Sequence, residues 1–169
     1  MTYRVLKYGG RWAGSGAGEL SVYYLNEVYP SGEAQLQAMR EAGPAGPIVM
    51  VNLLKFKDRA GYEDGRASTL SGREAYDIYG REVTKLVAGV GGRVLFSAEV
   101  TFLMLGQAHP LWDRVVLAEY PKRAALVRMA MSEAYQAIAP HRAAGLEGQL
   151  NIETVPQFNL ADILARTAG

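Results

Sequence analysis

The run IVMVNLLKF, at residues 48–56, is the sequence feature that most constrains the fold. Its side chains are apolar at both odd and even positions, whereas a strand with one face in water alternates apolar and polar residues. The pattern is therefore typical of a strand that is buried on both faces. A sheet that contains this strand needs cover on both of its sides.

The clearest helix signal begins at Ser71, which forms an S-x-x-E capping box with Glu74. An apolar stripe with i+3 and i+4 spacing follows, and Gly91 and Gly92 then end the helix. This segment is predicted to be a helix of about five turns. The members of the stripe are Tyr76, Tyr79, Val83, Leu86, Val87 and Val90.

A β-hairpin is expected after this helix. Residues 93–105 (RVLFSAEVTFLML) have the composition of a long strand, and residues 112–120 (WDRVVLAEY) that of its antiparallel neighbour. The segment between them, residues 106–111, is expected to be the short connection.

The last third of the chain is expected to form two short helices and a strand. Pro121 is suited to the first turn of a helix that runs to about Ala130, and Ser132 is suited to cap the next one. Pro140 is expected to interrupt that second helix, because proline has no N–H to donate and crowds the preceding turn. Residues 148–154 are predicted to form the final strand.

The order strand, helix, strand, strand, helix, strand predicts an α+β protein with a ferredoxin-like βαββαβ core. In this arrangement two helices cover one face of a four-stranded antiparallel sheet. The other face would expose a larger apolar patch than soluble monomers usually carry, because the strands at 48–56 and 93–105 are apolar at both parities. We therefore expect a homodimer that packs sheet against sheet, and the alternative is an N-terminal extension that folds back over the sheet.

Three regions are expected along the chain. Residues 1–45 form an N-terminal extension with a short helix near residues 32–42, residues 46–155 form the ferredoxin-like domain, and residues 156–169 form a C-terminal tail. The glycine-rich segment at residues 9–18 has neither GxGxxG spacing nor a terminal Gly-Lys-Ser/Thr. We interpret it as a linker.

The amino-acid composition argues against nucleic acid and anionic membranes as partners. The 18 basic and 17 acidic residues are scattered, which gives no electrostatic footprint for nucleic acid or for anionic membranes. The chain has no cysteine, which suits a reducing cytoplasm, and no uninterrupted apolar stretch of about 20 residues that could span a membrane. The expected partners are a second copy of the chain and a small molecule.

Five segments resemble an uncharacterised family, the domain-of-unknown-function family thirteen-thirty. They are PIVMVNLLKF, REAYDIYGREV, GGRVLF, WDRVVLAEYPKRAAL and SEAYQAIAPHRAAGL, and the resemblance extends over about residues 46–154. The resemblance implies a dimeric α/β barrel, in which two ferredoxin-like sheets face each other. That superfamily includes cofactor-free oxygenases, lactone isomerases and some haem enzymes, so the resemblance also implies small-molecule chemistry inside the barrel.

Asn52 is the most informative polar candidate, because an amide without partners is costly in a buried strand. It either orients a ligand in the barrel, or it is tied to local backbone or to the dimer partner. Tyr76 and Tyr79 either pack in the core or present a phenol hydroxyl to a substrate. Tyr135, which belongs to the family pattern, is assigned with them to substrate binding.

His141 and Arg142 are the candidate catalytic residues because they follow Pro140. There, the histidine could act as a general base and the arginine could hold a carboxylate or enolate oxygen. The alternative is a solvated helix end that favours cations. Glu119, in an otherwise apolar strand, is either a substrate ligand or a member of an ion pair with a nearby arginine.

No cofactor is expected. The two histidines, at 109 and 141, lie far apart in the sequence, so no metal-ligand spacing is present, and no GxSxG elbow appears. The leading hypothesis is a small-molecule-binding homodimer, with cofactor-independent oxygenase or isomerase activity on an acidic or enolisable compound as its enzymatic form. The alternative is a non-catalytic ligand carrier or interaction module, and haem or flavin chemistry is a third hypothesis.

Overall fold

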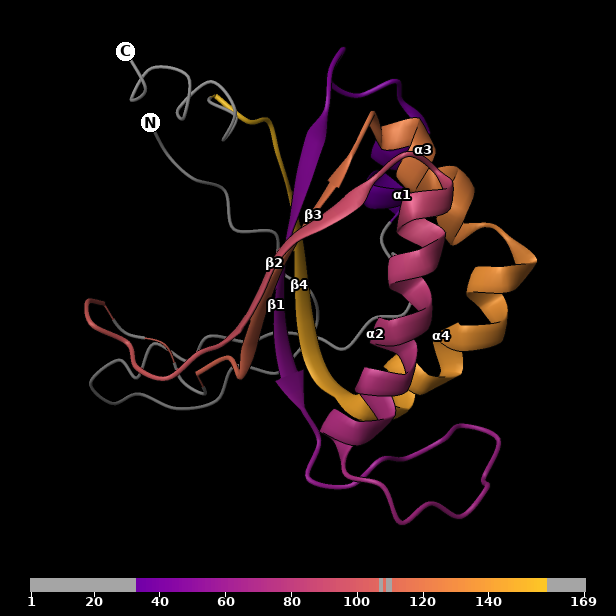
Figure 1. The fold of residues 1–169 in the computed structure, drawn as a ribbon, viewed down its shortest axis with the longest axis vertical. Helices are drawn as coiled ribbons and strands as arrows, with labels where there is room; N and C mark the ends of the chain where they lie inside the picture. Colours follow the sequence, from indigo (N-terminus) through magenta and orange to yellow (C-terminus); the bar gives the residue numbers. More distant parts are fainter. Residues whose placement is uncertain (1–32, 107, 109–110, 158–169) are drawn as a thin grey trace.

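The computed structural model describes residues 33–157 except 107, 109 and 110. Its elements follow the predicted βαββαβ order, with one additional helix before the first strand and another before the last helix (Figure 1). In chain order they are α1 (Glu33–Arg40), β1 (Ile48–Phe56), α2 (Gly72–Gly89), β2 (Arg93–Glu99), β3 (Arg114–Tyr120), α3 (Arg123–Ala130), α4 (Glu133–Gly145) and β4 (Leu146–Thr154).

The four strands form one antiparallel sheet in the order β2-β3-β1-β4. The long helices α2 and α4 lie side by side on one face of this sheet, and the other face carries no helix of the described part (Figure 1). This arrangement is the ferredoxin-like fold that the order of elements predicted.

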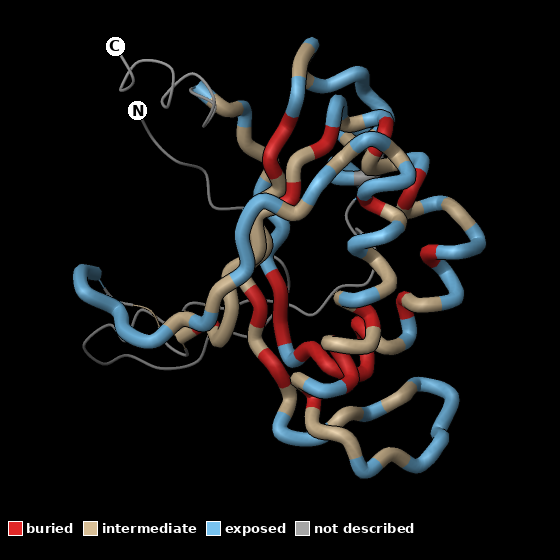
Figure 2. The backbone as a smooth tube through the Cα atoms, viewed as in Figure 1, coloured by how far each residue is buried: buried red, intermediate tan, exposed pale blue. Residues whose placement is uncertain are grey.

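The core lies between the sheet and the helices, and it defines which side chains of β1 point inward. Ile48 and Leu54 are fully buried, and Phe56 is 7% exposed. The buried parts of the chain, drawn red in Figure 2, lie in the sheet and in the helices that cover it. These even-numbered positions pack in one cluster with side chains of α2 and α4, including Tyr76 and Tyr135. The even positions of β1, Asn52 among them, therefore belong to the face that the helices cover.

The odd positions of β1 belong to the open face of the sheet. Val51 pairs in register with Leu117 of β3 and with Ile152 of β4, so this face is apolar across three strands. Ile152 is 45% exposed, and Phe96 of β2, which pairs with Leu117, is 51% exposed. No described element covers this face, and the N-terminal extension proposed as an alternative cover lies, up to residue 32, outside the described residues.

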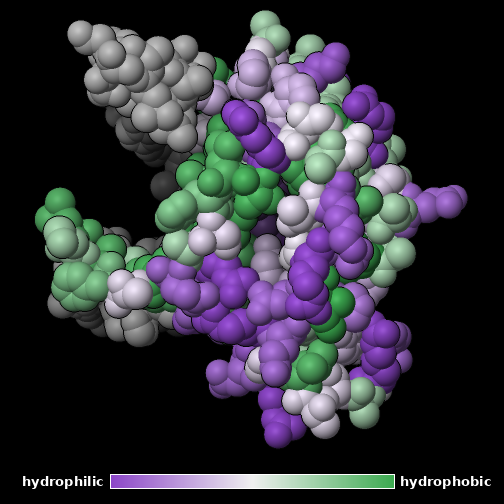
Figure 3. Space-filling model, viewed as in Figure 1, coloured by the Kyte–Doolittle hydropathy of each residue, from purple (hydrophilic) through white to green (hydrophobic). Residues whose placement is uncertain are grey.

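The predicted strand at residues 93–105 is too long. β2 ends at Glu99, and the N–H of Val100 donates its hydrogen bond to the carbonyl of Asp113 at 2.9 Å. Residues 100–106, which we call the arm, then leave the sheet on its open side (Figure 1). The apolar composition resembles a strand, but no neighbouring strand pairs with the arm within the described residues. Apolar atoms gather on it in Figure 3.

Pro140 does not interrupt the helix, contrary to the prediction. α4 continues through it to Gly145. Pro140 is exposed, whereas Ala139 and Ala143 are buried, so packing on the inner side of α4 stabilises the helix despite the missing N–H. As a consequence, His141 and Arg142 lie within a regular helix and not at an interrupted end.

The two predicted serine caps are confirmed, whereas Pro121 precedes Lys122, the N-cap of α3, and does not lie in the first turn of that helix. The Ser71 hydroxyl accepts a hydrogen bond from the Glu74 N–H at 3.2 Å, and the Glu74 carboxylate accepts one from the Ser71 N–H at 2.7 Å. Gly91 has a φ of 82°, the left-handed conformation that lets the chain turn away after α2. The Ser132 hydroxyl caps α4 by accepting a hydrogen bond from the Tyr135 N–H at 3.2 Å, without the reciprocal bond of a capping box.

The first turn of α2 and the last turn of α4 touch through two glycines. A Cβ placed on Gly72 would lie 2.5 Å from the carbonyl oxygen of Gly145, and one placed on Gly145 would lie 2.4 Å from that of Gly72. Gly72 also donates to the Lys57 carbonyl at 3.1 Å. The two helices can approach this closely only because neither residue has a side chain.

We expect Gly145→Ala to lower the free energy of unfolding by about 1–3 kcal/mol, because backbone must move to admit the methyl group. Gly80→Ala is the matched control, since Gly80 lies in α2 with open space around it. That change should stabilise the protein by about 0.5–1 kcal/mol through helix propensity. Urea unfolding followed by circular dichroism measures both, and equal effects of the two substitutions would contradict the close approach.

Candidate functional site

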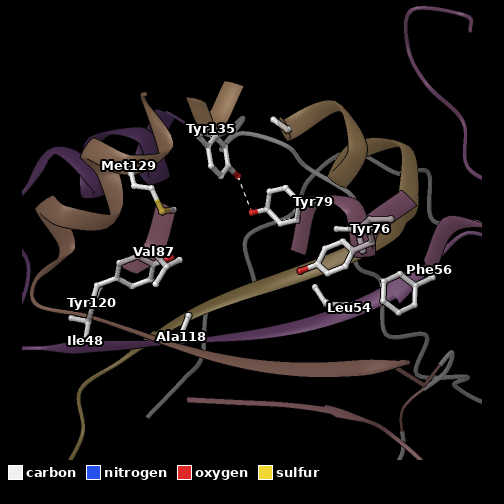
Figure 4. Packing of buried hydrophobic residues seen from close by; sticks show 12 residues of the cluster. Ile48, Leu54, Phe56, Tyr76, Tyr79, Val87, Ala118, Tyr120, Met129 and Tyr135 are labelled. Carbon is white, nitrogen blue, oxygen red and sulfur yellow. Dashed lines mark hydrogen bonds between the residues drawn. The ribbon is translucent and has the colours of Figure 1, made fainter. Parts of the chain in front are cut away.

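Four tyrosines bring their hydroxyl groups toward one region between the sheet and the helices. Figure 4 shows the hydroxyls of Tyr76, Tyr79, Tyr120 and Tyr135 pointing toward the middle of this region. The Tyr79 hydroxyl donates to that of Tyr135 at 3.5 Å, the outer limit of a hydrogen bond. All four side chains are buried, with exposed fractions of 8% or less. We call these residues the tyrosine cluster.

Three elements supply the cluster. Tyr76 and Tyr79 are three residues apart on α2 and therefore lie on the same helix face. Tyr135 lies in the first turn of α4, where its N–H donates to the capping Ser132 at 3.2 Å. Tyr120 ends β3 and pairs in register with the buried Ile48. The residue spacing on α2, the cap of α4 and the register of β3 therefore place the four side chains in one region.

Three phenols of the cluster, those of Tyr76, Tyr79 and Tyr120, have a raised pKa and are therefore neutral at neutral pH. Burial raises the pKa of Tyr76 to about 12 and that of Tyr79 well above its usual value. Burial also raises the pKa of Tyr120, and the neighbouring phenols of Tyr135 and Tyr76 raise it further. The hydroxyls of these residues can therefore donate hydrogen bonds, but they are poor general bases.

Arg142 brings a positive charge close to this cluster. Its side chain lies in the last turn of α4 and is only 4% exposed. The charge of Arg142 opposes the effect of burial and lowers the pKa of Tyr76 and of Tyr79. A buried guanidinium beside phenol donors favours an anionic or carbonyl oxygen in the same region.

Asn52 is held by hydrogen bonds within the sheet. Its Nδ2 donates to the backbone carbonyls of Met50 and Val116, both at 3.1 Å, and its Oδ1 accepts from Nε2 of Gln149 at 3.3 Å. The amide group is therefore tied to local backbone, which is one of the two interpretations that the sequence left open. Within this arrangement, Asn52 positions its neighbours on β3 and β4.

Gln149 carries the unpartnered polar atom of this region. Its Nε2 donates to Asn52 and to Asn151, but its Oε1 is buried and has no hydrogen-bond partner among the described residues. Gln149 pairs in register with Leu54, and Leu54 packs in one cluster with Tyr76 (Figure 4). Since neighbouring strands are about 4.8 Å apart, Gln149 lies close to the tyrosine cluster.

The tyrosine cluster, Arg142 and Gln149 together form what we call the interior site. It offers phenol and guanidinium donors, and one buried carbonyl acceptor that requires a donor from elsewhere. The surface is hollowed between the sheet and the helices in Figure 3. Such a set is suited to bind an oxygen-rich small molecule.

His141 lies apart from the interior site. Its Nδ1 is hydrogen-bonded to the Tyr62 hydroxyl at 2.7 Å, and the two rings pack edge to face. Tyr62 belongs to the segment between β1 and α2. Successive residues of a regular helix point about 100° apart, so His141 faces this segment while its neighbour Arg142 is directed inward. The structure therefore does not bring His141 and Asn52 together.

Glu119 lies on the opposite face of the sheet from the interior site. It pairs in register with Val49, an odd-numbered position of β1, and its carboxylate accepts from Nε of Arg93 at 2.9 Å. The ion pair that the sequence analysis gave as an alternative is thus present. Glu99 forms equivalent pairs with Arg73 and Arg114.

Two residues of the interior site, Tyr120 and Gln149, were not among the predicted site residues. The parity of β3 could have identified Tyr120, since it is two positions from Ala118 and both lie on the helix-covered face. Gln149 occurs in the sequence GQLN, which resembles a solvated edge strand. Its burial depends on the helices above it.

Two further properties of the described residues bear on function. Within the ranges that the structure covers, no three His, Cys, Asp or Glu side chains are grouped so that they could hold a metal ion. In the same part of the chain, no helix has the length and apolarity that crossing a membrane requires.

His141 generates a prediction about pH. Burial is the main cause that lowers the pKa of His141 below its ordinary value of 6.5, and the positive charge of Arg66 lowers it further. As the pH falls below about 6.5, His141 is therefore protonated in the unfolded chain before it is protonated in the folded one. The free energy of unfolding decreases over this range, until His141 is protonated in the folded state as well. Urea unfolding between pH 5 and 8 should show this loss, with a flatter profile for His141→Gln; an NMR titration giving a pKa above about 6.5 would contradict it.

Solved structures similar to the chain include proteins of unknown function. A protein from Rhodopseudomonas palustris is 31% identical, with 78% of this chain and 98% of that chain covered and a TM-score of 0.69. Its methylated form is 32% identical, with 79% and 97% covered and a TM-score of 0.70. A dimeric ferredoxin-like protein from Thermobifida fusca is 14% identical, with 66% and 92% covered and a TM-score of 0.43.

No curated protein matches the chain. A family profile does, over residues 65–154, which is more than half of the chain. The family is described as Domain of unknown function (DUF1330). The segments that suggested this family in the sequence lie largely within the matched range, and the chain belongs to the DUF1330 family.

Proposed function

We propose that the protein is a homodimer that binds a small acidic or enolisable compound in the interior site of each subunit. The observation that carries the proposal is the buried Oε1 of Gln149, which has no hydrogen-bond partner in the described part of the chain. Buried polar atoms are nearly always paired, because an unpaired one costs about 1–3 kcal/mol. A ligand that donates a hydrogen bond would remove this cost.

The surrounding donors specify the chemistry of the ligand. Neutral phenols and the Arg142 guanidinium favour a carboxylate, carbonyl or enolate oxygen. Gln149 Oε1 requires a hydroxyl or N–H at another position of the same molecule. A hydroxy acid, or the enol form of a dicarbonyl compound, carries both kinds of group on a few carbon atoms.

Two functions share this binding mode. In an enzyme, the donors would stabilise the enolate oxygen of the bound compound, as expected for a cofactor-independent oxygenase or isomerase. In a carrier, the same contacts would hold the compound unchanged. The raised pKa values of Tyr76 and Tyr79 argue against these phenols as bases and support binding and orientation as their role.

Binding can be tested with a panel of hydroxy acids, oxo acids and β-dicarbonyl compounds, using saturation-transfer NMR and then calorimetry. For a compound that binds, Tyr79→Phe and Gln149→Leu should each weaken binding about threefold to tenfold, the equivalent of one hydrogen bond. Tyr62→Phe is the matched control, because Tyr62 contacts His141 outside the site. Equal affinity of all three variants and the unmodified protein would disprove the site.

The same samples separate enzyme from carrier. Mass spectrometry of the compound after incubation in air should show a changed mass or an isomer if the protein is an oxygenase or isomerase. Quantitative recovery of the unchanged compound, together with tight binding, would support the carrier.

The homodimer rests on the open face of the sheet. Leu53, Leu117 and Phe96 lie on this face, and each strand that flanks β1 adds further apolar side chains. A sheet-to-sheet contact at about 10 Å spacing would cover them, and an ordinary stable interface needs about 800 Å² per partner. The apolar character of the face therefore supports a second copy of the chain as its cover.

Light scattering after size-exclusion chromatography should give twice the monomer mass of 18.4 kDa at micromolar concentration. Leu117→Lys should shift the mass toward that of the monomer, because a charge at the centre of the face cannot be desolvated cheaply. The far-ultraviolet circular dichroism of this variant should stay unchanged. A monomer mass for the unmodified protein would refute the dimer.

A further inference from the structure

The arm, residues 100–106, carries large apolar side chains that no described residue covers. Phe102 is 74% exposed, Met104 is 87% exposed and Leu105 is 90% exposed. Single exposed apolar residues are common, but three of them within four positions of one segment mark a contact surface. The interior site and the helix-covered core do not use these side chains.

The arm projects from the open side of the sheet. Figure 1 shows it leaving the end of β2 away from α2 and α4, on the side where a second sheet would pack. Seven extended residues span at most about 23–25 Å, whereas two packed sheets lie only about 10 Å apart. The arm is therefore long enough to reach past the sheet of a partner subunit.

Apolar side chains also remain exposed along the second half of β4 and just after it. Leu150 and Ile152 lie on the open face and are 36% and 45% exposed, and Val155, just after the strand, is 56% exposed. β4 is the edge strand opposite to β2, and its end pairs with the beginning of β1. The arm begins near Asp113, whose N–H donates to the carbonyl of Leu54 near the other end of β1. The arm and the end of β4 thus occupy diagonally opposite corners of the sheet.

Two-fold symmetry can bring these corners together. An axis between the two sheets, along the other diagonal, exchanges the two corners, so that each arm meets the end of the partner's β4. The strands of the two sheets then cross at about 90°, which is one of the two ways in which sheets pack. The same contact forms twice in this dimer. Together the two contacts cover the exposed apolar side chains of both arms and of both β4 strands, without any further partner.

We infer that the arm of each subunit packs against the Leu150–Val155 end of β4 in a second copy of the chain. The inference rests on the proposed homodimer and assigns its geometry. The arm then acts as a clasp on the edge strand that carries Gln149. The partner of the arm is thus the apolar edge strand β4 in a second copy of the same chain.

Because the chain contains no cysteine, single cysteines can be placed to test this contact. Met104→Cys and Ile152→Cys are made in separately tagged full-length chains, mixed to allow subunit exchange, and treated with a short bismaleimide. A covalent heterodimer is expected on a denaturing gel. Met131→Cys mixed with Ile152→Cys is the matched control and should give none, because Met131 is similarly exposed, at 77%, but follows α3 in the helical layer.

A second measurement tests the energetic role of the arm. The triple variant Phe102→Ser, Met104→Ser, Leu105→Ser should raise the dimer dissociation constant at least about tenfold in sedimentation equilibrium. Met131→Ser should leave it unchanged.

The outcomes separate the two proposals. A dimer mass by light scattering without cross-linking between positions 104 and 152, and with an unchanged dissociation constant in the triple variant, would overturn the clasp and leave the dimer standing. A monomer mass for the unmodified chain would overturn both.

Discussion

The position of β1 in the sheet is the constraint on which the rest of the structure depends. β1 pairs with β3 on one side and with β4 on the other, and it is apolar on both of its faces. The even positions, such as Ile48 and Leu54, are covered by α2 and α4, while the odd positions, such as Leu53, need cover from outside the described part of the chain. The enclosed core and the proposed interface are therefore two consequences of one strand.

Asn52 connects this strand to the chemistry of the interior. Because both hydrogens of its amide go to the backbone carbonyls of Met50 and Val116, Asn52 has only its oxygen left, and that oxygen accepts from Gln149. The Gln149 side chain is thereby turned so that its Nε2 faces the amides and its Oε1 is left without a donor. A residue with a structural role thus creates the acceptor that we assign to a ligand.

The fold could be predicted well from short sequence patterns, because a helix cap, a glycine after a helix and the composition of a strand each depend on a few neighbouring residues. The Ser71 capping box and the strand at residues 48–56 were found where the sequence placed them. The face that Asn52 occupies could not be predicted, since a strand that is apolar at both parities gives no alternation to follow. Pro140 was misleading because tertiary packing of α4 outweighs one lost hydrogen bond, and Gln149 was not identified because the sequence of β4 does not show which of its positions the helices cover.

The open face and the interior site share β4, and this links assembly to binding. Leu150 and Ile152 alternate along this strand with Gln149 and Asn151, so opposite faces of the same backbone would serve the proposed interface and the proposed ligand site. β4 is an edge strand that pairs only with β1 in the described sheet, and an edge strand is freer to move than a central one. A partner subunit that packs on Leu150 and Ile152 would restrict β4 and hold the Gln149 carbonyl in place. Dimerisation would then reduce the ordering cost of binding, which is the effect of preorganisation.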